Sequence, residues 1–227
     1  MRKNIIISML AAVSLSTAQA QGPAKYDPSV QPGEMQYFTP AGGNQFVGDC
    51  IPFFHDGTFY LYWSSRIGDR QVHHYCTTKD WFTFSTPAVY FDPGFTAIDM
   101  TILKEGDTYY AYYKDERNGE KTIRCATSKS LDPRVQRFEG STPLLPSRYI
   151  EVEGPEVFPA IGGKGWFLYF DKFNGDRGVS YTGCTDPSQH KWYPIPDDEI
   201  RNPTEVKHGS VEIISTAELE KLLEHFK

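Results

Sequence analysis

An all-β fold made of repeated antiparallel sheets is predicted by three observations. Aromatic residues make up 15% of the 227 residues, with 14 Tyr, 15 Phe and 4 Trp, and aromatic side chains favour strands. A pattern of strand, glycine turn and aromatic strand recurs three times at a spacing of about fifty residues, and each copy has the signals of a β-hairpin. Apolar residues at helical spacing are absent until the C-terminus. We therefore expect a series of sheets followed by one short helix.

The composition is that of a globular, acidic protein. Hydrophobic residues make up 39% and charged residues 23% of the chain, which excludes an intrinsically disordered protein, a collagen and a coiled coil. The formal net charge is −6. Nucleic acids and anionic membrane surfaces are therefore poor partners for this chain, and a neutral or cationic substrate fits better.

The N-terminus has the pattern of an export signal. Arg2 and Lys3 precede an apolar run over 5–13, and the Ala-Gln-Ala sequence ending at Ala20 has the small residues that signal peptidase reads. The apolar run is too short to span a bilayer. We expect residues 1–20 to be a signal peptide cleaved after Ala20, which gives a periplasmic or secreted protein without membrane insertion. A buried N-terminal helix is the alternative.

Three hairpin segments can be aligned with one another. They share the strand, the glycine turn and the aromatic strand: residues 54–63, 103–113 and 160–170. Tyr62, Tyr112 and Tyr169 occupy the same position in the three segments. Each hairpin is followed by a polar loop and a further strand. A four-stranded unit repeated at this spacing is typical of a β-propeller blade, and a β-sandwich with similar hairpins is the alternative.

The four cysteines do not form a recognisable framework. They lie too far apart for a disulfide scaffold or a zinc motif: Cys50, Cys76, Cys125 and Cys184. The last three occupy equivalent places in the strand that follows each hairpin. We expect these three to be buried free thiols on separate sheets.

The C-terminal segment is predicted to form an amphipathic helix. Ser215 and Glu218 have the spacing of a capping box. Apolar residues follow at helical spacing: Leu219, Leu222, Leu223 and Phe226. We interpret this apolar stripe as a packing surface.

An acidic residue stands at the start of the strand before each hairpin: Asp49, Asp99 and Glu153. In a propeller this strand is the innermost one, so three carboxylates from separate blades would meet at one end of the central axis. Cleavage of a glycosidic bond uses such groups, because one carboxylic acid protonates the leaving oxygen and one carboxylate activates water or attacks the sugar. A third negative charge would keep the acid protonated near neutral pH. Clustered carboxylates also bind calcium, which is the alternative reading.

Three motifs carry a resemblance to a known family. They are residues 91–110 (FDPGFTAIDMTILKEGDTYY), 152–155 (VEGP) and 207–211 (KHGSV). These segments resemble glycoside hydrolase family 43, and more closely the arabinofuranosidase- or xylosidase-like members of gut bacteria. The resemblance extends from Phe46 to the C-terminus and is most specific in the last two thirds of the chain.

The resemblance implies a role for each of these residues. Glu153 corresponds to the general acid, and Asp99 to the residue that raises the pKa of that acid and orients the substrate. His208 matches a histidine near the axis that in some members helps to hold a central calcium ion through water. A hydrogen-bonded interior histidine is the alternative for His208. The implied mechanism is inverting and requires no cofactor, with a structural calcium ion as an option.

The resemblance also implies a five-bladed β-propeller, of which this sequence shows only part. Three repeats are visible, and residues 21–45 and 196–215 could pair into a fourth blade. We assign residues 21–45 to an N-terminal extension and residues 46–227 to the glycosidase-like domain. Two alignments stay open for Asp49. It is either the general base of a compact enzyme or only the symmetry equivalent of a base on a missing blade.

The predicted activity is hydrolysis of terminal arabinofuranosyl or xylosyl residues, with galactosyl residues as a further option. The candidate substrate contacts are a histidine and aromatic rings able to stack on sugar faces: Trp63, Tyr113, Trp166 and His208. An oligosaccharide or polysaccharide is the expected partner, and an oligomer could complete the propeller. A glycan-binding propeller without activity and a structural propeller for protein partners are the alternatives.

Overall fold

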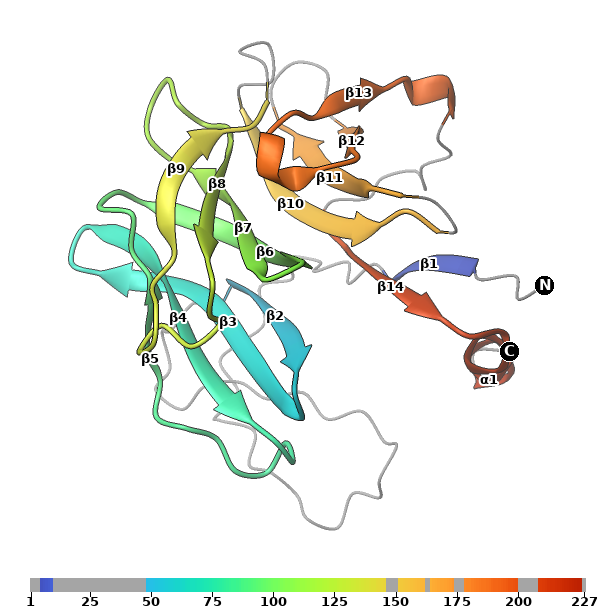
Figure 1. Cartoon of the computed structure of the whole chain (residues 1–227), viewed down its shortest axis with the longest axis horizontal. Coiled ribbons are helices and arrows are strands. Elements are labelled where there is room, and N and C mark those ends of the chain that lie inside the picture. The colour runs from blue at the N-terminus through green and yellow to red at the C-terminus, as the bar shows by residue number, and fades with distance from the viewer. Residues whose placement is uncertain are drawn as a thin grey trace, which may run out of the picture.

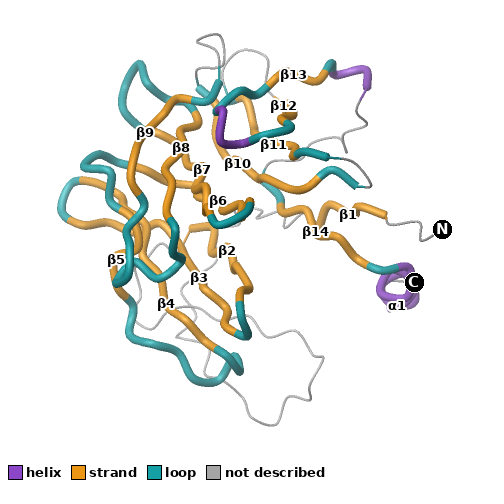
Figure 2. Tube along the Cα trace, viewed as in Figure 1, coloured by secondary structure: helices purple, strands orange, loops and turns teal. Residues whose placement is uncertain are grey.

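The computed structural model describes residues 5–9, 48–145, 151–161, 164–173, 178–199 and 208–225. Within these ranges the chain forms three four-stranded antiparallel sheets (Figure 1, Figure 2). The first sheet contains β2 (Gly48–His55), β3 (Thr58–Ile67), β4 (Arg70–Thr78) and β5 (Ala88–Phe91). The second contains β6 (Ala97–Glu105), β7 (Thr108–Asp115), β8 (Ile123–Ser128) and β9 (Glu139–Pro143). The third contains β10 (Val152–Pro159), β11 (Trp166–Lys172), β12 (Gly178–Cys184) and β13 (Tyr193–Ile195).

The order of the strands confirms the predicted repeat. In every sheet the strands are hydrogen-bonded in chain order, and each predicted hairpin joins the first two strands. Tyr62, Tyr112 and Tyr169 all lie opposite the residue that follows a β-bulge in the first strand, so they do share one position. The all-β fold is therefore as expected, while the number of blades in a complete domain stays a prediction.

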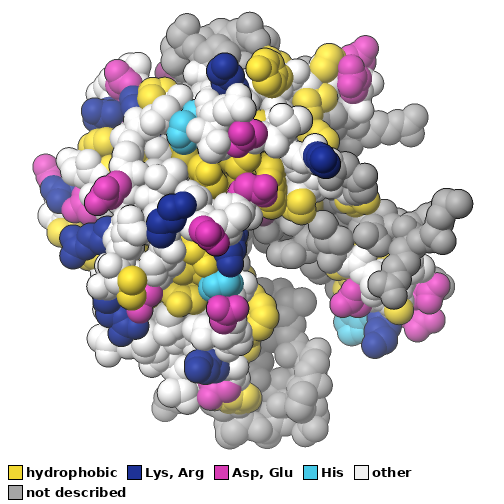
Figure 3. All heavy atoms as spheres, in the orientation of Figure 1, with side chains coloured by type: hydrophobic (Ala, Val, Ile, Leu, Met, Phe, Trp, Pro, Cys, Tyr) yellow, Lys and Arg dark blue, Asp and Glu magenta, His cyan; other side chains and the backbone are white. Residues whose placement is uncertain are grey.

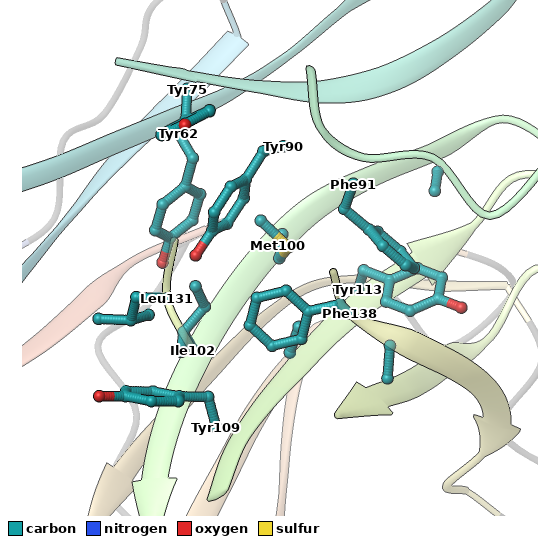
Figure 4. Close-up of a cluster of buried hydrophobic side chains, with 13 residues drawn as sticks. Tyr62, Tyr75, Tyr90, Phe91, Met100, Ile102, Tyr109, Tyr113, Leu131 and Phe138 are labelled. Carbon is teal, nitrogen blue, oxygen red and sulfur yellow. The ribbon is translucent and has the colours of Figure 1, made fainter. Parts of the chain in front are cut away.

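The second sheet is buried on both faces because it lies between the other two. Along β7, Tyr109 and Tyr113 belong to a buried cluster shared with the first sheet, which Figure 4 shows in close-up. Tyr110 and Tyr112 belong to a cluster shared with the third sheet. Side chains alternate between the two faces of a strand, so neighbouring tyrosines enter different cores. The high aromatic content thus fills the spaces between the sheets.

These cores predict a large effect of truncating a central ring. Phe170 of β11 is fully buried between the second and third sheets. We expect Phe170→Ala to lower the free energy of unfolding by about 3–5 kcal/mol, because it removes a buried ring and leaves a cavity. Phe82→Ala is the matched control, since Phe82 is 70% exposed, and it should cost less than about 0.5 kcal/mol. Urea unfolding measures both, and equal losses would contradict the assigned core.

The cysteine prediction is confirmed at the level of strands. Cys76, Cys125 and Cys184 are buried free thiols in β4, β8 and β12, the third strand of each sheet. Their register differs, however, because only Cys125 lies opposite the tyrosine of its repeat. Burial raises the pKa of Cys184 to about 12, so this thiol is unreactive at neutral pH. The side chain of Cys50 lies outside the described residues.

A further pair of strands lies beside the third sheet. β1 (Ile5–Met9), within the predicted signal peptide, pairs antiparallel with β14 (Ser210–Ile214). Val211 of β14 donates its backbone N–H to Glu156 of β10 at 3.4 Å. Residues 21–45, and with them the predicted fourth blade, lie outside the described residues. Two short 3₁₀ helices, η1 (Pro187–Gln189) and η2 (Asp197–Glu199), flank β13.

The predicted C-terminal helix is α1 (Thr216–His225). Ser215 caps it, since its hydroxyl accepts the N–H of Glu218 while the Glu218 carboxylate accepts the N–H of Ser215 at 2.6 Å. The expected packing of its apolar stripe is only partial, with Leu219 and Leu222 half-buried. No described residue of α1 is buried, and Leu223 is 56% exposed, because the helix projects beyond β14 and away from the sheets (Figure 1). None of the helices in the described ranges is long and apolar enough to cross a membrane.

Candidate functional site

The three candidate acids lie next to β-bulges in the first strands of the sheets, β2, β6 and β10. The ladders shift after Gly48, Ile98 and Glu153. Asp49 and Asp99 are thus the first unpaired residues of their bulges, whereas Glu153 is the paired residue just before its bulge. The prediction that the acids share one position is therefore wrong by one residue for Glu153. A bulge inserts an extra residue and re-aims the side chains beside it, which the sequence pattern does not show.

Asp99 joins the second sheet to the third. It is buried, with 8% of its surface exposed, and its backbone has a φ of +52°, a conformation that Asp adopts more readily than most residues. Its Oδ2 accepts a hydrogen bond from the backbone N–H of Gly154 at 3.1 Å. The carboxylate is therefore fixed beside the backbone that carries Glu153.

Glu153 extends from the start of β10 toward a buried cation. Its side chain is 16% exposed, and its Oε2 accepts a hydrogen bond from the Lys114 ammonium at 2.8 Å. Lys114 comes from the end of β7, has 4% of its side chain exposed and also pairs with Glu116. The sequence analysis does not identify Lys114. The alternation along β7 could have indicated it, because Lys114 follows Tyr110 and Tyr112 on the face toward the third sheet.

His208 closes the other side of Glu153. Its Nε2 lies 3.6 Å from Glu153 Oε1 and 3.7 Å from Oδ2 of the buried Asp171, which also accepts the His208 backbone N–H at 2.7 Å. Glycine is favoured at Gly154, because its φ is +58° and a Cβ would lie in tight contact with the His208 ring, at 3.1 Å. The Tyr169 hydroxyl donates to Asp171 at 3.0 Å, and burial together with the Asp171 charge raises the pKa of Tyr169.

The fold thus brings Asp99, Glu153 and His208 together. One ligand atom of each lies within 4.8 Å of the others. Asp99 comes from the second sheet, Glu153 from the third, and His208 from the segment before β14. Asp49 lies in β2 at the same register as Asp99, and its side chain lies outside the described residues. Its separation from Glu153 therefore stays a prediction.

The three groups that the structure describes do not by themselves make up the ligand set of a calcium ion, and the side chain of Asp49 lies outside the described residues. Calcium takes about six to eight oxygen ligands, whereas this cluster offers two carboxylates and an imidazole. The Lys114 ammonium, 2.8 Å from Glu153 Oε2, already supplies the positive charge at this carboxylate. A calcium ion held by His208 through water stays a prediction.

The predicted aromatic substrate contacts lie in different environments. Tyr113 is fully buried, and its hydroxyl donates a hydrogen bond to Ser141 at 3.0 Å. It is a core residue, so the prediction that it contacts the sugar is wrong. Trp166 pairs with Pro159, six residues beyond Glu153 along β10, which places it about 20 Å from the acids at the usual rise of a strand. Trp63 is partly exposed and stacks on His74, with the centres of the two rings 6.3 Å apart.

A groove of about 610 Å³ runs along the first strands. Its walls are mostly apolar: Phe53, Ile102, Leu103, Val157, Phe158 and Val211. Trp166 lines its far end, while none of Asp99, Glu153 and His208 is among the lining residues. Figure 3 shows exposed hydrophobic side chains among acidic, basic and histidine side chains near the middle of the molecule. The groove and the acid cluster are therefore neighbouring but separate features.

Comparison with known proteins agrees with this architecture. A family model described as a probable glycosyl hydrolase domain, related to glycoside hydrolase family 43, matches residues 38–220. The α-L-arabinofuranosidase of Bifidobacterium longum subsp. longum is 30% identical over 97 residues, which cover 37% of this chain and 9% of that protein.

Two solved structures share the fold. The Bacteroides ovatus protein titled Xyloglucan PUL GH43B is 18% identical with a TM-score of 0.53, over 70% of this chain and 30% of its own. The family 32 β-fructofuranosidase of Bombyx mori is 12% identical with a TM-score of 0.53, over 70% of this chain and 39% of its own. The chain therefore spans less than half the length of each of these relatives.

Proposed function

Because the chain belongs to the probable glycosyl hydrolase domain family related to glycoside hydrolase family 43, we propose that it hydrolyses glycosidic bonds by carboxylate acid–base catalysis. The observation that carries this proposal is the meeting of Asp99, Glu153 and His208 from three separate segments. Two carboxylates and a histidine at one point are costly to bury unless they are paired. Such groups are the ones that proton transfer to a leaving oxygen requires.

Each acid has a distinct part in the proposed reaction. Glu153 gives its proton to the glycosidic oxygen as the bond from that oxygen to the anomeric carbon breaks. A water oxygen bonds to the anomeric carbon from the opposite face, and Asp49 takes the proton of that water. Asp99 contributes a nearby negative charge that favours the protonated form of Glu153. The product has inverted configuration, and a separation of roughly 6.5–9.5 Å between Asp49 and Glu153 is expected for this mechanism.

The proposed substrates are glycans with terminal arabinofuranosyl or xylosyl residues, with galactosyl residues as a further option. The similarity to an α-L-arabinofuranosidase supports arabinose as the first choice. Trp63 and His208, both partly exposed, are the proposed sugar contacts. Export to the periplasm or the medium, where such polysaccharides are met, is part of the same proposal.

The test is a screen of released sugars. The protein is incubated with nitrophenyl glycosides of arabinofuranose, xylose and galactose and with arabinan and xylan, and the products are separated by chromatography. Release of arabinose or xylose supports the proposal, and release of neither overturns it.

A glycan-binding domain without catalysis is the second candidate function. It is favoured by the ion pair of Glu153 with Lys114, because a neighbouring ammonium favours the ionised carboxylate and a general acid has to carry a proton. Binding on a glycan array without release of any sugar in the same screen would support this candidate.

Asp99 is expected to set the alkaline limb of the pH profile of kcat/KM. Asp99→Asn removes a negative charge but keeps an oxygen for the Gly154 N–H, so Glu153 should lose its proton at lower pH and the limb should move down by about one pH unit. Asp107→Asn, in the exposed turn at the far end of β6, is the control and should leave the limb in place. An unchanged limb in Asp99→Asn would count against this role of Asp99.

A further inference from the structure

Lys114 is a buried cation that the proposed reaction does not use. Its ammonium donates a hydrogen bond to Glu153, pairs with Glu116 and lies 4.4 Å from the centre of the Phe173 ring. Lysines are rarely buried unless they are paired. Burial opposes the charge of Lys114, but the hydrogen bonds to Glu116 and Glu153 prevail and raise the pKa of the ammonium. Lys114 therefore carries a positive charge beside this carboxylate at neutral pH.

The position of Lys114 in the ladder makes it a bridge between two sheets. It lies opposite Ile98, directly before the bulge that carries Asp99. Its side chain leaves β7 on the face toward the third sheet and reaches Glu153 at the start of β10. The residue of the third sheet that is equivalent to Lys114 is Asp171, which lies opposite Glu153. Lys114 thus crosses from the strand beside Asp99 to the carboxylate of the proposed acid.

The two oxygens of Glu153 have different surroundings. Oε2 is held by the Lys114 ammonium at 2.8 Å, whereas Oε1 lies 3.6 Å from His208 Nε2. A proton on Oε2 would oppose the hydrogen bond that Lys114 donates, because an ammonium has donors and no acceptor. Oε1, on the partly exposed His208 side, is therefore the oxygen that can carry the proton without opposing the Lys114 hydrogen bond.

We propose that Lys114 is a positioning residue for Glu153, whose fixed ammonium holds Oε2, leaves Oε1 to carry the catalytic proton and sets the pH range over which that proton is held. The reactive role of Oε1 rests on the proposed function, while the effect of Lys114 on Glu153 does not. In the part of the chain that the structure describes, Asp99 of β6 and His208 before β14 cluster with Glu153, Asp171 of β11 lies opposite it, and Glu116 after β7 shares its partner Lys114. The carboxylates favour the protonated form of Glu153, and the Lys114 ammonium favours its ionised form.

The experiment is a titration of the Glu153 carboxyl by ¹³C NMR in the folded protein, with the signal assigned from Glu153→Gln. Lys114→Met should raise the midpoint of this titration by about one to three pH units, because it removes an opposite charge in direct contact. Lys114→Arg should restore most of the difference. Lys121→Met is the matched control, since Lys121 also pairs with Glu116 and lies near Phe173, but its side chain is 30% exposed and solvent screens its charge. The Glu153 midpoint in Lys121→Met should match the wild type.

An unchanged midpoint in Lys114→Met would overturn the proposal, as would an equal change in Lys121→Met. A purely structural lysine would lower the stability without moving this midpoint. Should Lys114→Met fail to fold, Lys114→Gln carries the same expectation, because it keeps a hydrogen-bond donor without the charge. In the active enzyme the alkaline limb of kcat/KM should rise with the midpoint. Absence of hydrolysis by the wild type would overturn the proposed function and leave the titration result standing.

Discussion

Glu153→Gln is expected to reduce hydrolysis of natural oligosaccharides and alkyl glycosides by about 10²–10⁴-fold in kcat/KM. The amide fills the same space and still accepts a hydrogen bond from Lys114, but it has no acidic proton for the leaving oxygen. Aryl glycosides with strongly acidic leaving phenols need little protonation, so part of their hydrolysis should persist. The measurement is kcat/KM for a series of substrates that differ only in the leaving group.

The control for this prediction is Glu139→Gln. Glu139 is an exposed residue of β9, and its replacement removes the same charge at a distance from the cluster. It should leave every substrate unaffected. A uniform loss over all leaving groups in Glu153→Gln would contradict the role of Glu153 as the proton donor.

Asp49→Ala is expected to produce a comparable loss, about 10²–10⁴-fold, but for all leaving groups alike. A general base acts on the attacking water and not on the departing oxygen, so an acidic phenol cannot compensate for its removal. Azide, a nucleophile that needs no base, should restore part of the rate and form a glycosyl azide of inverted configuration. Product analysis by NMR identifies that azide.

Asp56→Asn is the matched control for Asp49. Asp56 lies in the turn that follows β2, and its side chain is 88% exposed, so its replacement should not change the rate. Full activity of Asp49→Ala would contradict the assignment of the base. The alignment in which the base-bearing blade is missing would then be preferred, and hydrolysis by this chain would depend on a base outside the first sheet.

The repeat in the fold could be predicted because its signals are local. Each hairpin needs a turn and an aromatic strand within about ten residues, and Tyr62, Tyr112 and Tyr169 recur at matching points. The packing between sheets could not be predicted in the same way. Tyr113 is a candidate ligand contact in the sequence, but it is buried, as Tyr112 is, because the second sheet is covered on its two faces.

The candidate site could be predicted only in part. Asp99, Glu153 and His208 are recognisable from their motifs, and the structure brings them together. Glu153 is offset by one residue because it is the last paired residue before the bulge of β10, whereas Asp49 and Asp99 are the first residues within theirs. These bulges leave no mark in the hydrophobic pattern. Lys114 is missed because its partner Glu153 lies 39 residues further along the chain, in a different sheet. The alternation along β7 places Lys114 on the face toward the third sheet, but its contact with Glu153 follows from the packing of the sheets.

The most direct test is a crystal structure of the Glu153→Gln protein soaked with an arabinofuranosyl or xylosyl oligosaccharide. The proposal predicts that the glycosidic oxygen lies within about 3 Å of the side chain of residue 153, the reach of a proton donor. It also predicts that the terminal sugar contacts His208 and lies beside Asp99. An oligosaccharide bound only in the groove near Trp166, with no sugar at residue 153, would contradict the assignment of Asp99, Glu153 and His208 as a catalytic centre.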